Sequence, residues 1–201
     1  VCMVFKWFRS AEPAAKALPS PLNLRVGGAV ELDLLPFQVI SEQIKIDLPK
    51  GAQTIEAAGF IELGAGAALS RFYTADDGFF QVSSTGGFEP QHVDNIKLFV
   101  FEQTTALTSQ KGVDLWVGSN GSIGQPEFSL NGTVYHRVWD ESISGKIEPV
   151  KLEEVVHARE PETQPYTVDH LSMLYQRTLT DSDRIEYLLV SLESVSYTHL
   201  R

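Results

Sequence analysis

The sequence is poor in cysteine and contains no long apolar run. Cys2 is the only cysteine among the 201 residues, so the chain can form neither an internal disulfide nor a thiolate metal cluster. No stretch approaches the roughly 18 consecutive apolar residues of a membrane-spanning helix, and Lys6 interrupts the apolar start of the chain. These absences favour a reducing compartment, and we expect a cytoplasmic protein.

Basic side chains are also scarce relative to acidic ones. The chain carries 16 Lys and Arg against 26 Asp and Glu, which gives a formal net charge of -10 at pH 7. The basic residues are scattered singly, with no stripe of Lys and Arg interleaved with aromatic residues. Because this charge repels phosphate groups, we exclude nucleic acid as a partner and expect no adsorption of the whole surface to anionic membranes.

The sequence does contain enough apolar material for one folded domain. Hydrophobic residues make up 43% of the chain and aromatic residues 10%, whereas disordered chains are poor in both kinds. Residues 10–21 hold three prolines and four alanines with almost no large apolar side chain, which is typical of a linker. We therefore predict a flexible N-terminal arm over residues 1–21 and a single β-rich globular domain over residues 22–194. Residues 195–201 resemble translated adaptor DNA, and we interpret them as a non-native tail.

Alternation of apolar and polar residues predicts strands from the start of this domain onward. Apolar residues alternate with acidic ones over residues 30–34 and with charged ones over residues 44–48, as expected for half-buried strands. Residues Asn95–Glu102 are apolar on both alternating faces apart from Lys97, which favours a central strand. The best helix candidate is Ser109–Gly118, with the first residue as its N-cap.

Turn residues between strand-like segments indicate three hairpins. The turns are Asp76–Gly78, Asn131-Gly132 and Asp181–Asp183, and the first two supply the positive φ of a tight hairpin. The flanking strands are Ala68–Thr74 with Phe79–Ser83, Glu127–Leu130 with Thr133–Asp140, and His170–Thr178 with Arg184–Glu193. The sequence therefore predicts a mainly β fold, in which antiparallel hairpins form a sandwich or a partly open barrel with one or two short helices.

We expect the core to be built from large apolar side chains on these elements. The residues predicted to be buried are Phe99 or Phe101, Trp116, Leu174 and Leu189. Truncation of a buried large side chain to Ala costs roughly 2–5 kcal/mol of folding free energy, which is a large share of a domain's stability.

Five stretches of the domain resemble one bacterial family. They are LNLRVGGAVELD, LPKGAQTIEAAGFIELG, RFYTADDGFFQV, DNIKLFVF and HLSMLYQRTLTDSDRIEYLLVSLE, and they fall between Leu22 and Glu193. On these stretches the chain resembles the YjfK-like family of uncharacterised proteins. The resemblance implies no catalytic residues. The family's genes tend to sit beside those for a phage-shock-A-like membrane-stress protein and a glutathionylspermidine-synthase-like ligase, which implies a cytoplasmic accessory protein of an envelope-associated system.

The sequence offers no standard catalytic or metal-binding motif. No Gly-x-Ser-x-Gly elbow is present, and Cys2 lies in the arm, where no base can be held against it. The segment Gly64–Ala68 lacks the third small residue of a dinucleotide fingerprint, which favours a turn. Glu154 and His157 have the spacing of a carboxylate–histidine metal pair, but a second copy is missing, so a solvated acidic face is the simpler interpretation. We therefore predict neither a metal nor a cofactor.

A first polar group of candidate site residues lies on the first predicted hairpin. Its members are Arg71, Tyr73, Asp76 and Asp77. Alternation places the first two on one face of the hairpin, where they could contact a ligand or a partner. A surface hairpin with an ordinary ion pair is the alternative that we favour, because exposed pairs of this kind are common and weak.

A second group would be an acid–base neighbourhood around two histidines. It consists of His136, Arg137, Asp140, Asp169 and His170, with Glu141 beside them. General acid–base chemistry needs a histidine near a carboxylate in a cleft. Solvent-facing strand residues are the interpretation that we favour for this group as well.

Taken together, these observations favour a non-enzymatic interaction or regulatory module with a protein partner. The alternative is an enzyme or small-molecule binder that uses the His136 and His170 neighbourhood, which requires a cavity where both histidines converge. Phe5, Trp7 and Phe8 in the arm would give weak membrane contact or none. An exposed strand edge would also permit a homo-oligomer.

Overall fold

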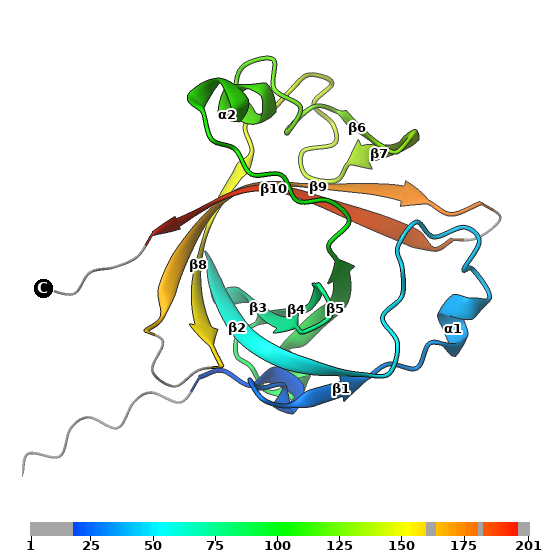
Figure 1. The fold of residues 1–201 in the computed structure, drawn as a ribbon, viewed down its shortest axis with the longest axis vertical. Helices are drawn as coiled ribbons and strands as arrows, with labels where there is room; N and C mark the ends of the chain where they lie inside the picture. Colours follow the sequence, from blue (N-terminus) through cyan, green and yellow to red (C-terminus); the bar gives the residue numbers. More distant parts are fainter. Residues whose placement is uncertain (1–17, 160–163, 181–182, 197–201) are drawn as a thin grey trace, which may run out of the picture.

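The computed structural model describes residues 18–159, 164–180 and 183–196, which form one curled sheet with short helices outside it (Figure 1). The strands are β1 (Ala29–Glu31), β2 (Ala52–Gly64), β3 (Ala67–Thr74), β4 (Gly78–Thr85), β5 (Val93–Val100), β6 (Glu127–Leu130), β7 (Thr133–Arg137), β8 (Val150–Ala158), β9 (Tyr166–Thr178) and β10 (Ile185–Ser196). The helices are α1 (Leu35–Gln38) and α2 (Gln110–Val117), and short 3₁₀ turns span Pro21–Asn23 and Pro90–His92. In this part of the chain, neither helix has the length and apolar character needed to span a membrane. The prediction of a mainly β fold with one or two short helices is confirmed.

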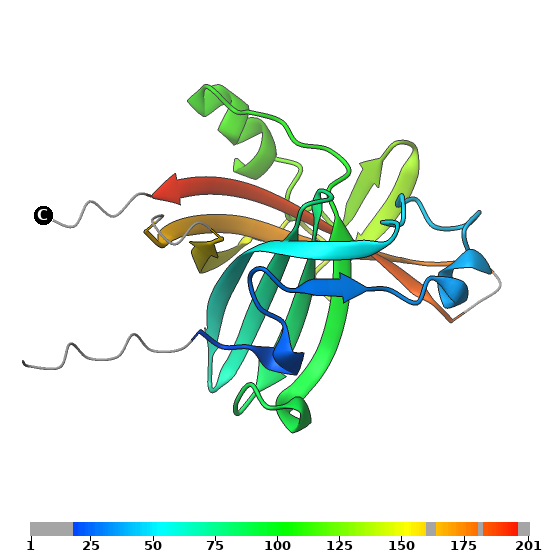
Figure 2. The ribbon, with the colours of Figure 1, turned by 60° about the horizontal axis from the view of Figure 1, so that its bottom comes forward.

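All strands pair antiparallel in a single sheet. The order is β5-β4-β3-β2-β8-β9-β7-β6, with β1 beside β2 and β10 beside β9. The sheet bends so that its β2–β5 half faces its β9–β10 half (Figure 1), and the strands of the two halves run across each other (Figure 2). No ladder joins β5 to β10 within the described ranges, although the Lys97 ammonium lies 5.0 Å from the centre of the Tyr187 ring. Of the two predicted architectures, this unclosed curl corresponds to the partly open barrel.

Two predicted hairpins form with the predicted turn residues. β3 and β4 turn at Asp77, whose φ is 50°. β6 and β7 turn at Asn131 and Gly132, whose φ values are 48° and 78°. Positive φ at both central residues is the geometry of a type I′ turn, which Asn-Gly adopts with little strain. The segment Gly64–Ala68 also begins as a tight turn, between β2 and β3, as favoured from the sequence.

The third predicted hairpin is formed by β9 and β10, which pair from Ile185 with Thr178 to Ser196 with Thr167. Part of its turn, residues 181–182, lies outside the described residues. The same holds for the arm side chains Phe5, Trp7 and Phe8, so their weak membrane contact stays a prediction. β10 itself continues through Ser196, two residues into the segment interpreted as a tail.

Near the start of the domain, one predicted strand is absent and another is short. Residues 44–48 form a loop, because side chains of the β9–β10 hairpin bind its backbone. Glu186 accepts a hydrogen bond from the Lys45 amide at 2.6 Å, and Arg177 donates one to the Gln43 carbonyl. Residues 30–34 give only the end of β1, since the chain turns into α1 at Pro36, which has no amide hydrogen for a ladder.

The prediction that Asn95–Glu102 forms a central strand is wrong. It corresponds to β5, which stands at one end of the strand order. Both of its faces are apolar because both are covered. Leu98 packs with an apolar cluster on one face, and Phe99 stacks on Phe79 at 5.1 Å on the other. A strand covered on both faces shows this pattern whether or not both of its edges are paired.

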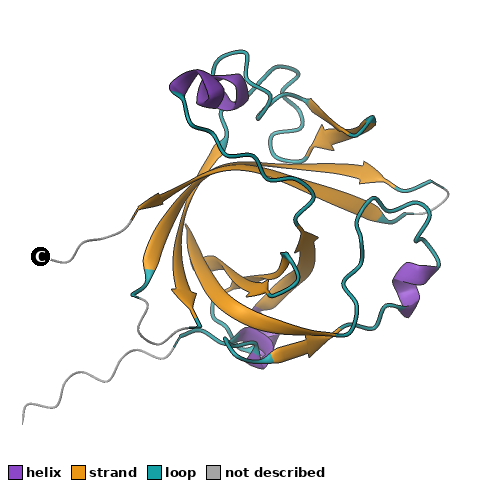
Figure 3. Cartoon of the chain, in the orientation of Figure 1, coloured by secondary structure: helices purple, strands orange, loops and turns teal. Residues whose placement is uncertain are grey.

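The predicted helix is confirmed, together with its cap. α2 spans Gln110–Val117, and the hydroxyl of Ser109 accepts a hydrogen bond from the Gly112 amide at 3.2 Å. Gly118 ends the helix, with its amide bound to the Asp114 carbonyl. Figure 3 shows the helices outside the curled sheet and the segment between β5 and α2 crossing its open end.

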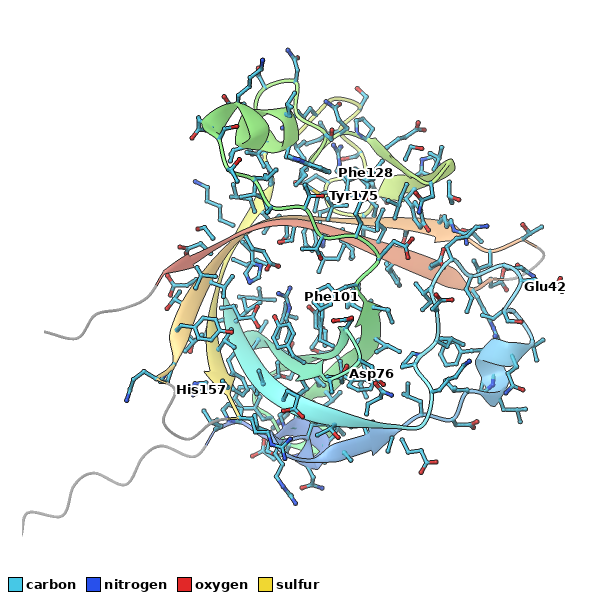
Figure 4. The ribbon with its side chains drawn as sticks, viewed as in Figure 1. Glu42, Asp76, Phe101, Phe128, His157 and Tyr175 are labelled. Carbon is cyan, nitrogen blue, oxygen red and sulfur yellow. The ribbon has the colours of Figure 1, made fainter. Side chains whose placement is uncertain are left out.

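Two apolar clusters lie on the outer side of the curl, where peripheral segments cover the sheet. The first lies on β2–β5 under the N-terminal segments, and its buried members are Ile55, Ala58, Phe72, Phe80 and Val82. The second joins β9 and β10 to α2 and to the β6–β7 hairpin, and its buried members are Ile123, Tyr135, Met173 and Tyr175. Figure 4 shows Tyr175 and its neighbour Phe128 on this outer side.

The residues predicted to form the core are not at the centres of these clusters, and most of them lie on the inner face of the sheet. Trp116 packs against the second cluster. Leu174 and Leu189 are opposite each other on β9 and β10 and are half-buried. Phe99 is half-buried too, whereas Phe101 is 50% exposed. Apolar composition alone therefore indicates which strands are covered, but not which of their residues are the most buried.

Truncation of Phe72 will test this assignment. Phe72 is fully buried in the first cluster, so Phe72→Ala is expected to lower the free energy of unfolding by about 3–5 kcal/mol in urea denaturation. Phe101→Ala is the matched control, because half of that side chain stays in water. Equal losses in the two variants would contradict the position of the core.

Candidate functional site

The carboxylate of Glu154 lies at the centre of the inner face of the curl. Glu154 projects from β8 and is completely buried, with an exposed fraction of 0%. Space for it exists because Gly59, on the neighbouring strand β2, has no side chain. A Cβ at Gly59 would lie 1.6 Å from the Oε1 atom of Glu154. The glycine is therefore required by the carboxylate beside it.

Three side chains donate hydrogen bonds to this carboxylate. The Tyr73 hydroxyl binds Oε1 at 2.8 Å, and the Arg71 guanidinium binds Oε2 at 2.9 Å. The Nε2 atom of His170 lies 2.8 Å from Oε2. These donors come from β3 and β9, so the Glu154 network, defined as Arg71, Tyr73, Glu154 and His170, joins the two halves of the sheet.

Further contacts hold the donors in place. Arg71 also donates to the Gln81 amide oxygen at 3.0 Å and lies over the ring of Phe79, 5.2 Å from its centre. The Nδ1 atom of His170 lies 3.2 Å from the Glu193 carboxylate and 3.3 Å from the Ser191 hydroxyl. The network thus extends through His170 from the interior to Glu193, which is half exposed.

The pKa values follow from competition between burial and these partners. For Glu154, burial acts to raise the pKa, but the hydrogen bond from His170 and the charge of Arg71 outweigh it, so the pKa is lowered. For His170, burial acts to lower the pKa, but hydrogen bonds to Glu154 and Glu193 raise it above its usual value. Burial and the Glu154 charge raise the pKa of Tyr73, which therefore stays a neutral donor at pH 7.

This arrangement suits structural pairing better than acid–base chemistry. Both oxygens of Glu154 already accept hydrogen bonds, and both ring nitrogens of His170 face hydrogen-bond partners. A buried ion pair satisfied in this way joins the strands that contribute to it, and removal of one partner leaves an uncompensated charge. A base for catalysis would need a free lone pair that faces a cleft.

The first candidate group is divided by the structure. Arg71 and Tyr73 share one face of β3, as predicted, and both reach Glu154. Asp76 and Asp77 lie in the exposed turn after β3, outside the network (Figure 4). The favoured interpretation of a surface ion pair is wrong for Arg71, which is only 2% exposed.

The histidines of the second candidate group do not converge. His136 pairs with Gln176, six residues along β9 from His170, which separates the two histidines by about 20 Å. His136 is exposed, whereas His170 is buried. Asp169 is exposed beside His170 on β9, and Asp140 is exposed in the loop after β7.

Arg137, the remaining member of that group, has a role within the fold. Within the described residues, it is buried and donates hydrogen bonds to main-chain carbonyls. These are the carbonyls of Gly124 at 2.6 Å, Gly145 at 2.8 Å, Asp140 at 3.1 Å, and Ile143. The guanidinium therefore holds the loop that follows β7 against the loop that precedes β6.

The interpretation of Glu154 as part of a solvated acidic face is wrong, because its side chain is fully buried. Strand alternation was the available signal, since it places Glu154 with the apolar residues Leu152 and Val156, and Glu153 on the opposite face. His157, three residues on, lies on the outer face beside Phe60 (Figure 4). No three His, Cys, Asp or Glu side chains within the described residues are grouped so as to hold a metal ion.

Gly59→Ala will test whether this glycine makes room for the carboxylate. The added Cβ displaces Glu154 from its donors, so a loss of about 3 kcal/mol or more in the free energy of unfolding is expected. In a Glu154→Ala background the same substitution is expected to cost much less, because the clash is gone. An equal loss in both backgrounds, measured in urea, would contradict the proposed contact.

The pKa shifts predict how stability depends on pH. The folded pKa of His170 is raised above 6.5, so its contribution is complete below pH 6.5 and is lost as the pH rises through the folded value. The folded pKa of Glu154 is lowered below 4.5, so its contribution is complete above pH 4.5 and is lost in acid. The stability difference between wild type and His170→Asn is expected to shrink from pH 6.5 to pH 9. A constant difference over that range would refute the linkage.

Comparison with known proteins gives a family but no activity. The model of a family described as "Protein of unknown function (DUF2491)" matches residues 3–199. The "Uncharacterized protein YjfK" of Escherichia coli (strain K12) is 32% identical over 179 residues, which cover 86% of this chain and 77% of that protein. No solved structure gives a significant match. The resemblance inferred from five sequence stretches is confirmed, and the chain belongs to the DUF2491 family of proteins of unknown function.

Proposed function

We propose that this protein is a non-enzymatic interaction or regulatory module that binds a protein partner. The acidic and basic groups of the Glu154 network are bound to one another, which favours a structural role for them. The separation of His136 from His170 along β9 gives the enzymatic alternative no support. We therefore assign partner binding to exposed residues on the surface.

The observation that carries the proposal is an exposed apolar patch on α1. The patch consists of Leu35 and Val39, which are one helical turn apart and therefore lie on the same side of this turn. Leu35 is 67% exposed and Val39 is 81% exposed. Single exposed apolar residues are ordinary, whereas neighbouring ones with this much exposed surface favour a contact surface.

The fold holds this patch in position. The Leu35 amide donates to Asp33 at 3.0 Å, and Arg184 donates to the Pro36 carbonyl at 2.7 Å. Downstream, the Lys45 amide binds Glu186 of β10. A segment tied at both ends presents its side chains with little loss of conformational entropy on binding.

Charge favours a protein over a membrane or nucleic acid as the partner. The chain carries a net charge of -10, and the carboxylates of Asp33 and Glu42 lie near the patch (Figure 4). These negative charges repel anionic lipids and the phosphates of nucleic acids. The resemblance to the YjfK-like family extends the proposal to a cytoplasmic accessory role in an envelope-associated system.

Site-specific photo-crosslinking in a native bacterial host tests the proposal. A photoreactive residue in place of Val39 of the full chain is expected to give a discrete adduct with a protein, identified by mass spectrometry. The same residue in place of Leu115, which is 67% exposed on α2, is the matched control. An adduct with a second copy of the chain would identify a homo-oligomer. Absence of an adduct at Val39, or identical adducts at both positions, would overturn the proposal.

A further inference from the structure

A cavity of about 530 Å³ lies away from α1 and from the Glu154 network. It forms between the Pro21–Asn23 turn and the segment that connects β4 to β5. The residues that matter for the argument are Leu22, Asn23, Gly87, Phe88, Glu89 and His92. Its volume is in the range of pockets that hold small molecules.

The backbone of one wall is held in an unfavourable conformation. Leu22 and Asn23 have φ values of 57° and 62°, in the left-handed region that residues with side chains rarely occupy. The Ser20 hydroxyl donates to the Leu24 carbonyl at 2.8 Å and closes this turn. With the hydrogen bond from the Leu24 amide to the Pro21 carbonyl at 3.1 Å, these two φ values make a type I′ turn, in which Asn23 is a favoured residue and Leu22 is the strained one.

The opposite wall carries a histidine paired with a carboxylate. The Nδ1 atom of His92 lies 2.8 Å from the Oε2 atom of Glu89. The pair lies directly on the backbone at Gly87, where a Cβ would be 2.4 Å from Nδ1 and 2.6 Å from Oε2. Glycine at this position lets the two side chains lie against the backbone without moving aside.

This pairing determines what the wall offers to a ligand. In a neutral His92 ring, a proton on Nδ1 donates to the carboxylate and leaves Nε2 as an acceptor. Hydrogen bonds from its own backbone amide and from His92 lower the pKa of Glu89, which keeps the carboxylate charged at neutral pH. The cavity lining contains no Lys or Arg, whereas Leu22, Phe88 and Pro90 supply apolar surface.

We propose that this cavity binds a small organic amine with an apolar body. The ammonium group would pair with Glu89 and donate to Nε2 of His92, and the apolar body would lie against Leu22 and Phe88. A carboxylate that faces a solvent-accessible apolar wall attracts a cation and repels an anion of the same shape. This inference is independent of the interaction surface on α1, since the two share no residue.

Titration of the full chain followed by ¹H–¹⁵N NMR tests the proposal with three probes of the same shape. Benzylamine is expected to give saturable shifts at Gly87 and His92. Benzyl alcohol is expected to bind more weakly, and benzoate is expected to give no saturable shift. Glu89→Gln is expected to weaken benzylamine binding by about fivefold, because a partly exposed ion pair contributes up to about 1 kcal/mol. Glu141→Gln, which removes an exposed carboxylate elsewhere, is expected to leave the affinity unchanged.

Three results would overturn the inference. The first is a lack of saturable shifts at Gly87 and His92 with benzylamine. The second is equal affinity for benzylamine and benzoate, which would remove the charge argument. The third is equal weakening by Glu89→Gln and Glu141→Gln, which would reflect net charge alone. Because both substituted side chains are exposed, neither variant depends on the core for its folding.

Discussion

The buried carboxylate of Glu154 is the constraint on which the rest of the fold depends. Removal of a carboxylate from water costs several kcal/mol unless charged and polar donors replace the lost solvent. Its donors belong to β3 and β9, strands nearly a hundred residues apart in the sequence of 201. They reach one carboxylate because β3, β2, β8 and β9 are consecutive neighbours in the sheet and present these side chains on the same face. The glycine at position 59, on β2 between Arg71 and Glu154, leaves room for the contact.

Two apolar clusters lie on the outside of the curl, while Ile61, Phe79 and Val156 are buried on its inner face with the Glu154 network. Each half of the sheet buries its outer face under a peripheral segment, the N-terminal turns on one side and α2 with the β6–β7 hairpin on the other. These short segments therefore carry a large part of the hydrophobic stabilisation. The domain therefore has an apolar layer on each outer side, and buried apolar and charged side chains lie together between the two layers.

The features of the fold that depend on residues close together in the sequence can be predicted from it. The Asp77 and Asn131 turns and the Ser109 cap are determined by residues within a few positions of each other, and each was predicted. Residues 44–48 have the alternation of a strand, but the Lys45 amide binds Glu186 and the preceding Gln43 carbonyl binds Arg177, both far along the chain. For the same reason Arg71 and His170 were assigned to separate groups. Nothing local indicates that both contact Glu154.

The contacts of Arg137 have a consequence for how relatives can diverge. Its guanidinium binds main-chain carbonyls from the two loops around the β6–β7 hairpin, and every amino acid supplies such a carbonyl. The side chains of these loops can therefore drift during evolution while the contact persists. The arginine has no equivalent, because a lysine ammonium has only three donors and lacks the planar fork that reaches several carbonyls at once. Variation in this region is expected to accumulate in the loops and to spare the residue that gathers them.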